Sequence, residues 1–289
     1  MRFVFLGTGT SAGVPAIACE CAVCASSDPR DRRLRTSACV MFRDPSGVER
    51  VVLIDTSPDL REQALRQRLM RCDAVVFTHN HVDHTFGLDE VRRFNVVMKA
   101  PIDVYAEEHT LDHLRRVYRH VFERDHNVND SFVASLIPHR LEIERPVDLF
   151  GVRFTPIRLL HGRLPIAGFR IEPVPGAGVI AGESSPFPLA YCTDVSAIPT
   201  ESWKHLEGLG TLVLDALRQR HHPTHLTIDR AVEIAGRVGA RRTYFVHMAH
   251  DLGHAETEAA LPEGVRLAYD GLVLGSDEAT ERRSDEVAE

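Results

Sequence analysis

The six residues from position 79 to position 84 constrain this chain more than any other feature. The apolar run Ala74–Phe77 has the composition of a buried strand, and His79, His81, Asp83 and His84 follow it. Because side chains alternate along an extended chain, His79 and His81 can point to the same side. Imidazole and carboxylate groups are the donors that zinc and similar divalent ions favour. Without an ion such a cluster would cost desolvation and repulsion, so we predict a metal site.

Four donors on one turn are more than a single tetrahedral ion with an open position would take, so we predict two adjacent ions. Further donors should come from distant strand ends, which a layered sheet brings together. An apolar strand followed directly by a donor recurs at His161, Asp194 and His247. Each of these is weak evidence alone, and the recurrence is much stronger. Asp194 could bridge both ions.

Short apolar strands alternate with helical stretches along the chain. The strand candidates are β-branched or aromatic runs bounded by Gly, Pro or Asp: Arg2–Leu6, Val51–Ile54, Ala74–Phe77, Ile102–Tyr105, Val152–Leu159, Leu189–Cys192, Thr211–Leu214, Thr243–Val246 and Val265–Ala268. The helix candidates are Asp59–Met70, Glu107–Phe122, Ile228–Val238 and Ala255–Leu261. This mixture predicts an α/β layered fold. Two polar or proline-rich segments, 125–131 and 172–188, are predicted as loops.

Charge limits the classes of partner. The formal net charge is −7, and residues 276–289 hold six acidic residues and two arginines, which leaves the rest of the chain weakly acidic. A body without basic excess argues against a surface that binds nucleic-acid phosphates. We expect one domain over residues 1–275 and a disordered acidic tail over residues 276–289. No apolar run reaches the roughly 18–20 residues of a membrane helix, and no signal peptide is recognisable, so we expect a cytoplasmic protein.

Three cysteines, Cys19, Cys21 and Cys24, lie close together near the N-terminus. In a cytoplasmic protein, clustered cysteines favour metal binding over disulfides. Three thiolates need one more donor to close a tetrahedral zinc site, and the candidate is His250, three residues after His247. The alternative is three free thiols in a surface loop. We predict a structural zinc, because a site with four protein ligands leaves no position for a substrate.

The donor pattern resembles the metallo-β-lactamase superfamily over residues 1 to about 275. The motif is His-X-His-X-Asp-His at 79–84 with the later His161, Asp194 and His247. The resemblance implies an αββα sandwich with a dinuclear metal site, of Zn or Mn, at the sheet edges. Asp55, which follows Val51–Ile54, matches the strand-end aspartate of this family, which orients the site from outside the ligand shell.

The cysteine cluster and the glycine loop Gly7–Pro15 resemble the PhnP branch of this superfamily. Its members are phosphodiesterases that open a cyclic phosphate on ribose and carry an extra zinc site of this kind. The chain end agrees, at 247–250, 261–265 and 269–271. The resemblance therefore implies hydrolysis of a small cyclic phosphodiester such as a ribose 1,2-cyclic phosphate. It also implies that Asp83 belongs to the catalytic group.

The sequence His225-Leu226-Thr227 resembles a motif of phosphodiesterases, including tRNase Z enzymes, in which the histidine lies near the leaving group. We therefore predict that His225 is the general acid, since an imidazole pKa near 6.5 suits proton transfer at neutral pH. The alternative is a structural histidine beside the helix cap Thr227. Arg218 could contact a phosphate with its planar guanidinium, or pair with a surface carboxylate.

Three other functions share this scaffold. A tRNase Z-like nuclease would need a basic arm for RNA, which the weakly acidic body disfavours. A flavodiiron-type redox protein has Glu at the position of His81. A non-catalytic PQQ-biosynthesis-type binding protein would tolerate lost ligands, whereas all seven expected ligands are present here. We expect a small-molecule phosphodiester as partner, without nucleic acid or membrane. The native metal, the exact substrate and a homodimer are left open.

Overall fold

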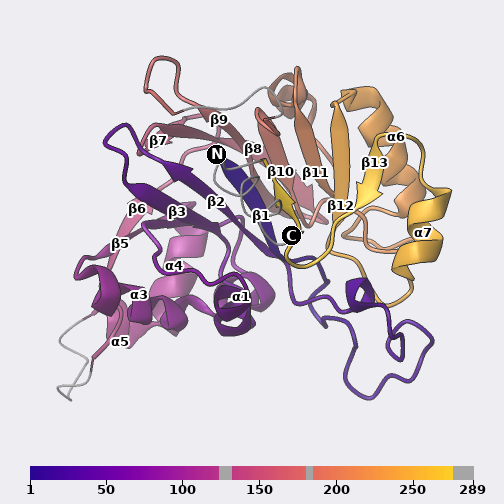
Figure 1. The fold of residues 1–289 in the computed structure, drawn as a ribbon, viewed down its shortest axis with the longest axis horizontal. Helices are drawn as coiled ribbons and strands as arrows, with labels where there is room; N and C mark the ends of the chain where they lie inside the picture. The colour runs from indigo at the N-terminus through magenta and orange to yellow at the C-terminus, as the bar shows by residue number, and fades with distance from the viewer. Residues whose placement is uncertain (124–131, 180–184, 276–289) are drawn as a thin grey trace, which may run out of the picture.

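Two mixed β-sheets face each other across a shared apolar layer (Figure 1). This computed structural model describes residues 1–123, 132–179 and 185–275. The strand order of the first sheet is β14-β1-β2-β3-β4-β5-β6. Its strands are β1 (Arg2–Gly7), β2 (Ser37–Arg43), β3 (Glu49–Ile54), β4 (Ala74–Val76), β5 (Ile102–Ala106), β6 (Leu136–Arg140) and β14 (Val273–Leu274).

The second sheet has the order β13-β12-β11-β10-β9-β8-β7. Its strands are β7 (Val147–Leu149), β8 (Val152–His161), β9 (Leu164–Pro173), β10 (Leu189–Cys192), β11 (Thr211–Asp215), β12 (Arg242–Val246) and β13 (Val265–Leu267). Strands β10 to β13 pair parallel with one another, whereas the pairs β7–β8, β8–β9 and β9–β10 are antiparallel.

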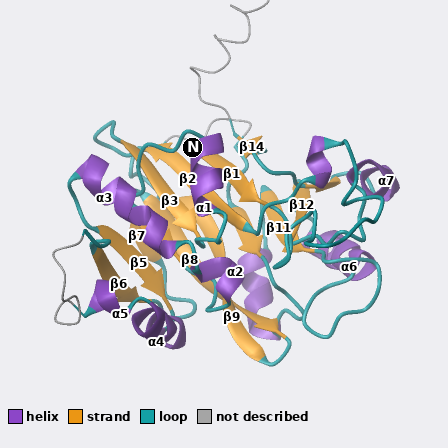
Figure 2. Ribbon diagram, turned by 90° about the horizontal axis from the view of Figure 1, so that it is seen from below, coloured by secondary structure: helices purple, strands orange, loops and turns teal. Residues whose placement is uncertain are grey.

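Helices flank the sandwich on both sides (Figure 2). Beside the first sheet lie α1 (Leu60–Arg66), α3 (Arg92–Met98), α4 (Glu108–Val117) and α5 (Arg119–Phe122). Beside the second sheet lie α6 (Ile228–Val238) and α7 (His254–Ala260). The short helix α2 (Val82–Thr85) carries part of the metal motif, and 3-10 turns span Pro29–Asp31, Leu88–Val91 and Thr200–Leu206. Within the described residues, no helix combines the length and apolarity that crossing a membrane requires.

The period-2 alternation of strand side chains explains how one sheet serves two apolar layers. On β1, Phe3 and Phe5 enter the layer between the sheets, whereas Val4 and Leu6 pack toward the helices. All four side chains are almost completely buried. Both faces of this sheet are therefore covered, so positions that a ligand can reach lie at its edges.

Parallel pairing aligns the strand ends that matter for the site. Cys192, Leu214 and Phe245 lie in register across β10, β11 and β12. In the first sheet, Ile54 of β3 lies in register with Val76 of β4. The residues that follow these strands therefore emerge at the carboxyl edge of each sheet, where open α/β sheets bind ligands.

The layered α/β fold predicted from the sequence is confirmed, with differences in detail. The strand Leu189–Cys192 and the helix Ile228–Val238 have the predicted bounds. The predicted helix Glu107–Phe122 is two helices, because Tyr118 leaves the helical conformation at φ −105° and ψ 42°. Five strands were not predicted: β2, β6, β7, β9 and β14. The loop predicted at 125–131 and the acidic tail 276–289 lie outside the described residues, as does part of the loop 172–188.

Candidate metal centre and active site

The donors predicted from the sequence meet where the carboxyl edges of the two sheets face each other. From the first sheet come His79 and His81, in the loop after β4, and Asp83 and His84, on α2. The second sheet contributes the donors that follow its strands: His161 at the end of β8, Asp194 after β10 and His247 after β12. Neither sheet alone supplies the complete set.

The donor atoms fall into two adjacent groups. His79, His81 and His161 form one group, and Asp83, His84, Asp194 and His247 form the other, with the atoms of each group within 4.8 Å of one another. The rings of His79 and His84, which belong to different groups, have centroids 4.3 Å apart. Asp194 also lies within 4.8 Å of His161 and His225, so its carboxylate is placed between the groups.

The geometry of the second group suits a metal ion better than a hydrogen-bond network. The Nε2 atoms of His84 and His247 lie 3.2 and 3.1 Å from oxygens of Asp194. Yet these Nε2 atoms, like that of His79, are buried without a hydrogen-bond partner among the described residues. Tetrahedral ligands about 2.0–2.1 Å from an ion lie roughly 3.3 Å apart. The donor set and its spacing therefore fit two divalent ions.

The histidines of the two donor groups also differ in their protonation. Burial lowers the pKa of His79, His81 and His161, so the first group is neutral and ready to donate lone pairs. Burial would also lower the pKa of His84 and His247, but neighbouring carboxylates, above all Asp194, outweigh it. They raise the pKa of His84 well above its usual range and that of His247 to about 10. In the second group an arriving cation must therefore displace protons.

Asp55, for which the resemblance implies an orienting role, contacts the donor set through His84. Its side chain is completely buried, and its Oδ2 lies 2.8 Å from His84 Nδ1. Thr78 donates to the same carboxylate from its backbone N and its Oγ1, both at 2.8 Å. These contacts hold the His84 ring with Nε2 toward the other donors. The backbones of Asp55, Asp194 and His247 all have positive φ, near +60°, a strained conformation that gathers at functional sites.

His225 lies against the metal groups and is held by a partner that sequence reasoning missed. Its Nδ1 lies 3.0 Å from Asp215 Oδ1, and the other oxygen of Asp215 accepts from Leu226 N at 2.8 Å. Asp215 is completely buried. Because this carboxylate accepts, Nδ1 carries a proton and Nε2 remains available for a ligand. Asp215 directly ends β11, so the strand-then-donor pattern that identified Asp194 could have identified it as well.

A cavity of about 740 Å³ opens over the donors. Besides donors and His225, its lining includes Ser11 of the glycine loop, Asn80, Val82, His113 and Leu164. His113, on α4, was not predicted. Arg116 Nη2 lies 3.4 Å from its Nδ1, and since arginine only donates, Nε2 of His113 carries the ring proton. That Nε2 is buried without a partner among the described residues.

The structure does not bring Arg218 to the cavity. Its Nε and Nη2 instead donate at 3.3 Å to the backbone carbonyls of Arg220 and His221. These hydrogen bonds hold Arg218 against the loop that precedes His225. Arg218 is not among the described residues that line the cavity.

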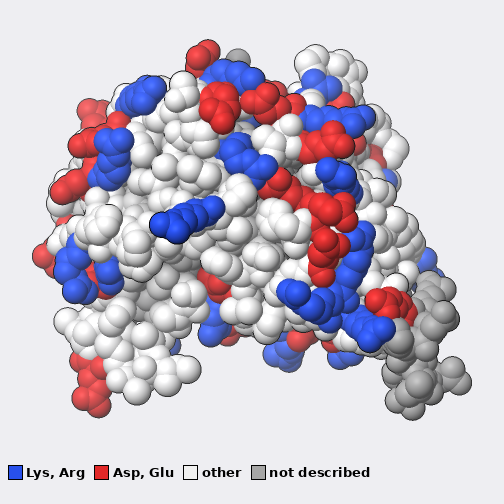
Figure 3. All heavy atoms as spheres, turned by 180° about the vertical axis from the view of Figure 1, so that it is seen from behind, with Lys and Arg blue, Asp and Glu red and all other residues white. Residues whose placement is uncertain are grey.

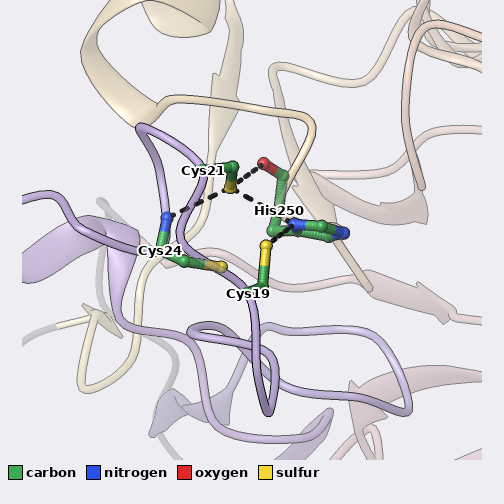
Figure 4. Close-up of side chains that lie close together, drawn as sticks. All are labelled: Cys19, Cys21, Cys24 and His250. Atoms are coloured by element: carbon green, nitrogen blue, oxygen red, sulfur yellow. Dashed lines mark hydrogen bonds between the residues drawn. The ribbon is translucent and has the colours of Figure 1, made fainter.

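The cysteines predicted as a zinc site converge with His250 (Figure 4). Cys19 Sγ and Cys21 Sγ lie 3.2 and 3.3 Å from His250 Nδ1, and the four donor atoms, with that of Cys24, lie within 4.8 Å of one another. Hydrogen bonds from the backbone of Cys24 and from His250 lower the pKa of Cys21 to about 6. A thiolate is the form that binds zinc. The chemistry of the donors and their spacing fit one tetrahedral zinc ion.

Comparison with known proteins identifies the family. The family model of the beta-lactamase superfamily domain matches residues 50–248, more than half of the chain. This chain belongs to the beta-lactamase superfamily. The αββα sandwich implied by the sequence motif is confirmed with it.

Within this superfamily the PhnP-like resemblance is also confirmed. A crystal structure of a new diphosphatase from the PhnP family shares 43% identity and a TM-score of 0.81, covering 95% of this chain and 97% of that one. The Zn²⁺-bound PqqB of Methylobacterium extorquens shares only the fold, at 21% identity and a TM-score of 0.71 over 96% of this chain and 100% of that one.

One curated relative has a different name. An octanoyltransferase of Porphyromonas gingivalis is 34% identical over 99% of this chain, and the matched part is 54% of that protein. The chain thus spans about half the length of this relative. Together, the comparisons and the donor groups give the chain the metallo-β-lactamase fold with candidate metal donors at the edges of its sheets.

Proposed function

We propose that the chain is a dinuclear metal-dependent phosphodiesterase that hydrolyses a small cyclic phosphodiester, such as a ribose 1,2-cyclic phosphate. The observation that carries this proposal is the Asp215–His225 pair, which lies beside two adjacent donor groups with Asp194 between them. A phosphodiester needs stabilisation of negative charge at phosphorus and a proton for the departing oxygen. The donor groups and His225 are suited to supply one requirement each.

The donor groups would hold two divalent ions, Zn or Mn, through His79, His81 and His161 on one side and Asp83, His84, Asp194 and His247 on the other. Such ions, when bound, supply Lewis-acid activation of water and of the phosphoryl oxygens. Asp83 lines the cavity, where its carboxylate accepts a hydrogen bond from the attacking water. His225 donates its Nε2 proton to the departing sugar oxygen, while Asp215 stabilises the imidazolium through Nδ1.

The rest of the cavity wall would bind the part of the substrate that does not react. His113 lines the cavity and would contribute an imidazole ring to the substrate-facing wall. Leu164, on the turn into β9, supplies an apolar contact on the same cavity. A cavity of this volume accommodates a small molecule.

The cysteine cluster would hold a third ion, a structural zinc bound by Cys19, Cys21, Cys24 and His250. All four ligands come from the protein, so this ion would stabilise the fold and take no part in the reaction. Three of its ligands lie in the long segment between β1 and β2, which has little regular structure of its own.

Two alternatives are tested beside this proposal. The 43% identical relative is named a diphosphatase, which favours cleavage of a diphosphate as the second candidate. A tRNase Z-like nuclease is less well supported, because the formal net charge of the chain is −7. On the face drawn in Figure 3, most basic side chains lie beside acidic ones, with wide uncharged areas between them. RNA binding relies instead on clustered basic side chains.

The test is an assay of protein reconstituted with Zn²⁺ or with Mn²⁺. Ribose 1,2-cyclic phosphate, 2′,3′-cyclic nucleotides, bis(p-nitrophenyl) phosphate, a diphosphate ester and a pre-tRNA are offered at equal concentrations, and Asp194→Ala is the control. We expect ribose 1,2-cyclic phosphate to have the highest kcat/KM and the control to be inactive. Faster cleavage of the diphosphate ester would favour the second candidate. Cleavage of none of the phosphodiesters by metal-loaded protein would refute the proposal.

A further inference from the structure

One short segment of chain joins the two metal-binding clusters. His247 follows β12 and belongs to the buried histidine–aspartate group, and His250, three residues later, belongs to the cysteine group. We call residues 247–252 the linking segment. It begins with a residue in the left-handed region, at φ +62° for His247. Because so few bonds separate the two donors, a backbone shift in this segment moves a ligand of each cluster.

Backbone hydrogen bonds hold the start of the linking segment from two sides. Met248 N donates to Thr8 O at 3.0 Å, and Met248 O accepts from Thr10 N at 3.1 Å, so the segment pairs with the glycine loop. Ala249 N donates to Leu217 O at 2.9 Å, beyond the end of β11. These bonds account for the section next to His247, but not for the section that carries His250.

Arg33 holds the section around His250. Its guanidinium donates to Ala249 O at 3.0 Å through Nη1 and to Leu252 O at 2.6 Å through Nη2. The two acceptors lie on either side of His250. The side chain has no exposed surface, and Asp31 balances its charge at 3.2 Å. Arg33 also pairs through its backbone with Val14, at the entrance to the cysteine segment.

The surroundings of Arg33 leave little room for adjustment. Asp31 Oδ1, which contacts the guanidinium, also accepts from His254 N at 2.7 Å and so ties in the start of α7. A Cβ at Gly9 would lie 2.7 Å from Arg33 O and 2.9 Å from Arg33 Cβ, so only glycine permits the close approach of the two chain segments. A buried guanidinium that lost its acceptors would pay a large desolvation cost, so the segment is tied to one position.

We propose that Arg33 is a positioning residue that couples the two metal centres, so that zinc in the cysteine site raises the metal affinity of the buried histidine–aspartate site. Zinc fixes His250, Arg33 fixes the carbonyls on both sides of it, and His247 is thereby held in its strained ligating conformation. The coupling is reciprocal, and such couplings typically change affinity by about 5–150-fold. The proposal rests on metal binding at both sites and is independent of the substrate.

The test is a double-mutant cycle on metal affinity, which requires no substrate. Metal-free wild type, Cys21→Ser, Arg33→Met and the double variant are titrated with Zn²⁺ against a colorimetric chelator. The Co²⁺–thiolate absorption band separately reports occupancy of the cysteine site. We expect Cys21→Ser to weaken the histidine–aspartate site about tenfold. In the Arg33→Met background, the same cysteine replacement should weaken it less than twofold.

Two further variants separate coupling from loss of structure. Arg35 lies two residues after Arg33, but among the described residues its guanidinium donates to Asp59 and to Ser11 O and not to the linking segment. Arg35→Met should therefore leave the tenfold effect of Cys21→Ser intact. Arg33→Lys, which keeps the charge with fewer donors, repeats the cycle if Arg33→Met is unfolded by circular dichroism, and should retain part of the effect.

The outcomes discriminate clearly. If Cys21→Ser weakens the histidine–aspartate site equally with and without Arg33, the two losses are additive. Arg33 then only stabilises the fold, and the coupling is overturned. A wild type that binds no Co²⁺ through thiolates would overturn it together with the structural zinc. Inactivity towards every phosphodiester would leave the cycle intact and would affect the proposed function alone.

Discussion

His225 is the single residue on which the proposed chemistry depends most specifically. We expect His225→Ala to slow a ribose cyclic phosphodiester about 10²–10⁴-fold, the usual contribution of a general acid. A p-nitrophenyl ester should lose much less, because p-nitrophenolate leaves without a proton. Metal content should stay at the wild-type value. Both rates and bound metal are measured on the same preparation.

Two results would contradict this role of His225. Equal losses on the sugar ester and the nitrophenyl ester would remove the proton-donor assignment. Loss of a bound ion would make His225 a ligand instead, an outcome that its position within 4.8 Å of His161 and Asp194 makes worth measuring.

The pH dependence of metal binding should differ between the two donor groups. The carboxylates raise the pKa of His84 well above its usual range and that of His247 to about 10, so both rings hold a proton near neutral pH before an ion arrives. Binding to their group releases protons, and its affinity should rise about tenfold per pH unit for each proton released. The group of His79, His81 and His161 has lowered pKa values and is already neutral at pH 7, so its affinity should change little.

Proton release in weakly buffered solution, measured during a Zn²⁺ titration at pH 8, checks this prediction. Competition with a chelator at pH 7, 8 and 9 gives the affinities of both sites independently. Two sites with the same pH dependence would show that the carboxylates do not keep His84 and His247 protonated.

At the scale of elements, the segment between β1 and β2 should owe its order to the cysteine site. Replacing Cys21 with Ser removes a donor of that cluster, and metal-binding free energy in a structural site is folding free energy. We expect the loss of one zinc ion and a lower melting temperature. Asp194→Ala, at the end of β10, should abolish activity with a smaller effect on folding. Unchanged zinc content and melting temperature in Cys21→Ser would show that the cluster is not a zinc site.

Elements that carry the donors could be predicted because their signal is local. Strands β10 and β12 are short and mainly apolar, and Asp194 and His247 follow them within two residues. Strand β8 is longer, with an apolar last part that ends at His161. Strand β9 was missed because Pro165 and Gly168 interrupt its pattern. At Gly168 a Cβ would lie 2.9 Å from Tyr191 O, so the close packing of β9 against β10 requires glycine there. This packing outweighs the low strand propensity of glycine.

Arg33 shows what the sequence could not reveal. It lies in a stretch of arginines and aspartates that has the composition of a solvated loop. Its acceptors, Ala249 O and Leu252 O, are more than two hundred residues away, so its burial depends on contacts that no local pattern records. His113 was missed for the same reason, since its place in the cavity follows from how α4 packs.

At the scale of the whole molecule, the active site belongs to the interface of two sheets. The first sheet and its connections supply His79, His81, Asp83 and His84, and the second supplies the other three donors. An ion with ligands from both sheets binds the folded protein and not the unfolded chain. Its binding therefore stabilises the fold by about 2.7 kcal/mol at a hundred times its dissociation constant.

The total metal content of the protein reports how many of the donor groups hold an ion. The two adjacent active-site donor groups and the cysteine group predict three ions per chain in protein purified without chelator, counted by elemental analysis. Gradual chelation should remove them in two phases, because the two active-site positions face the cavity whereas the cysteine site is closed by four protein donors. Cys21→Ser should lose the phase of the cysteine site and keep the phase of the two active-site positions. A reproducible content near one ion in fully active protein would exclude a dinuclear centre, since Asp194 would then have no second ion to bridge.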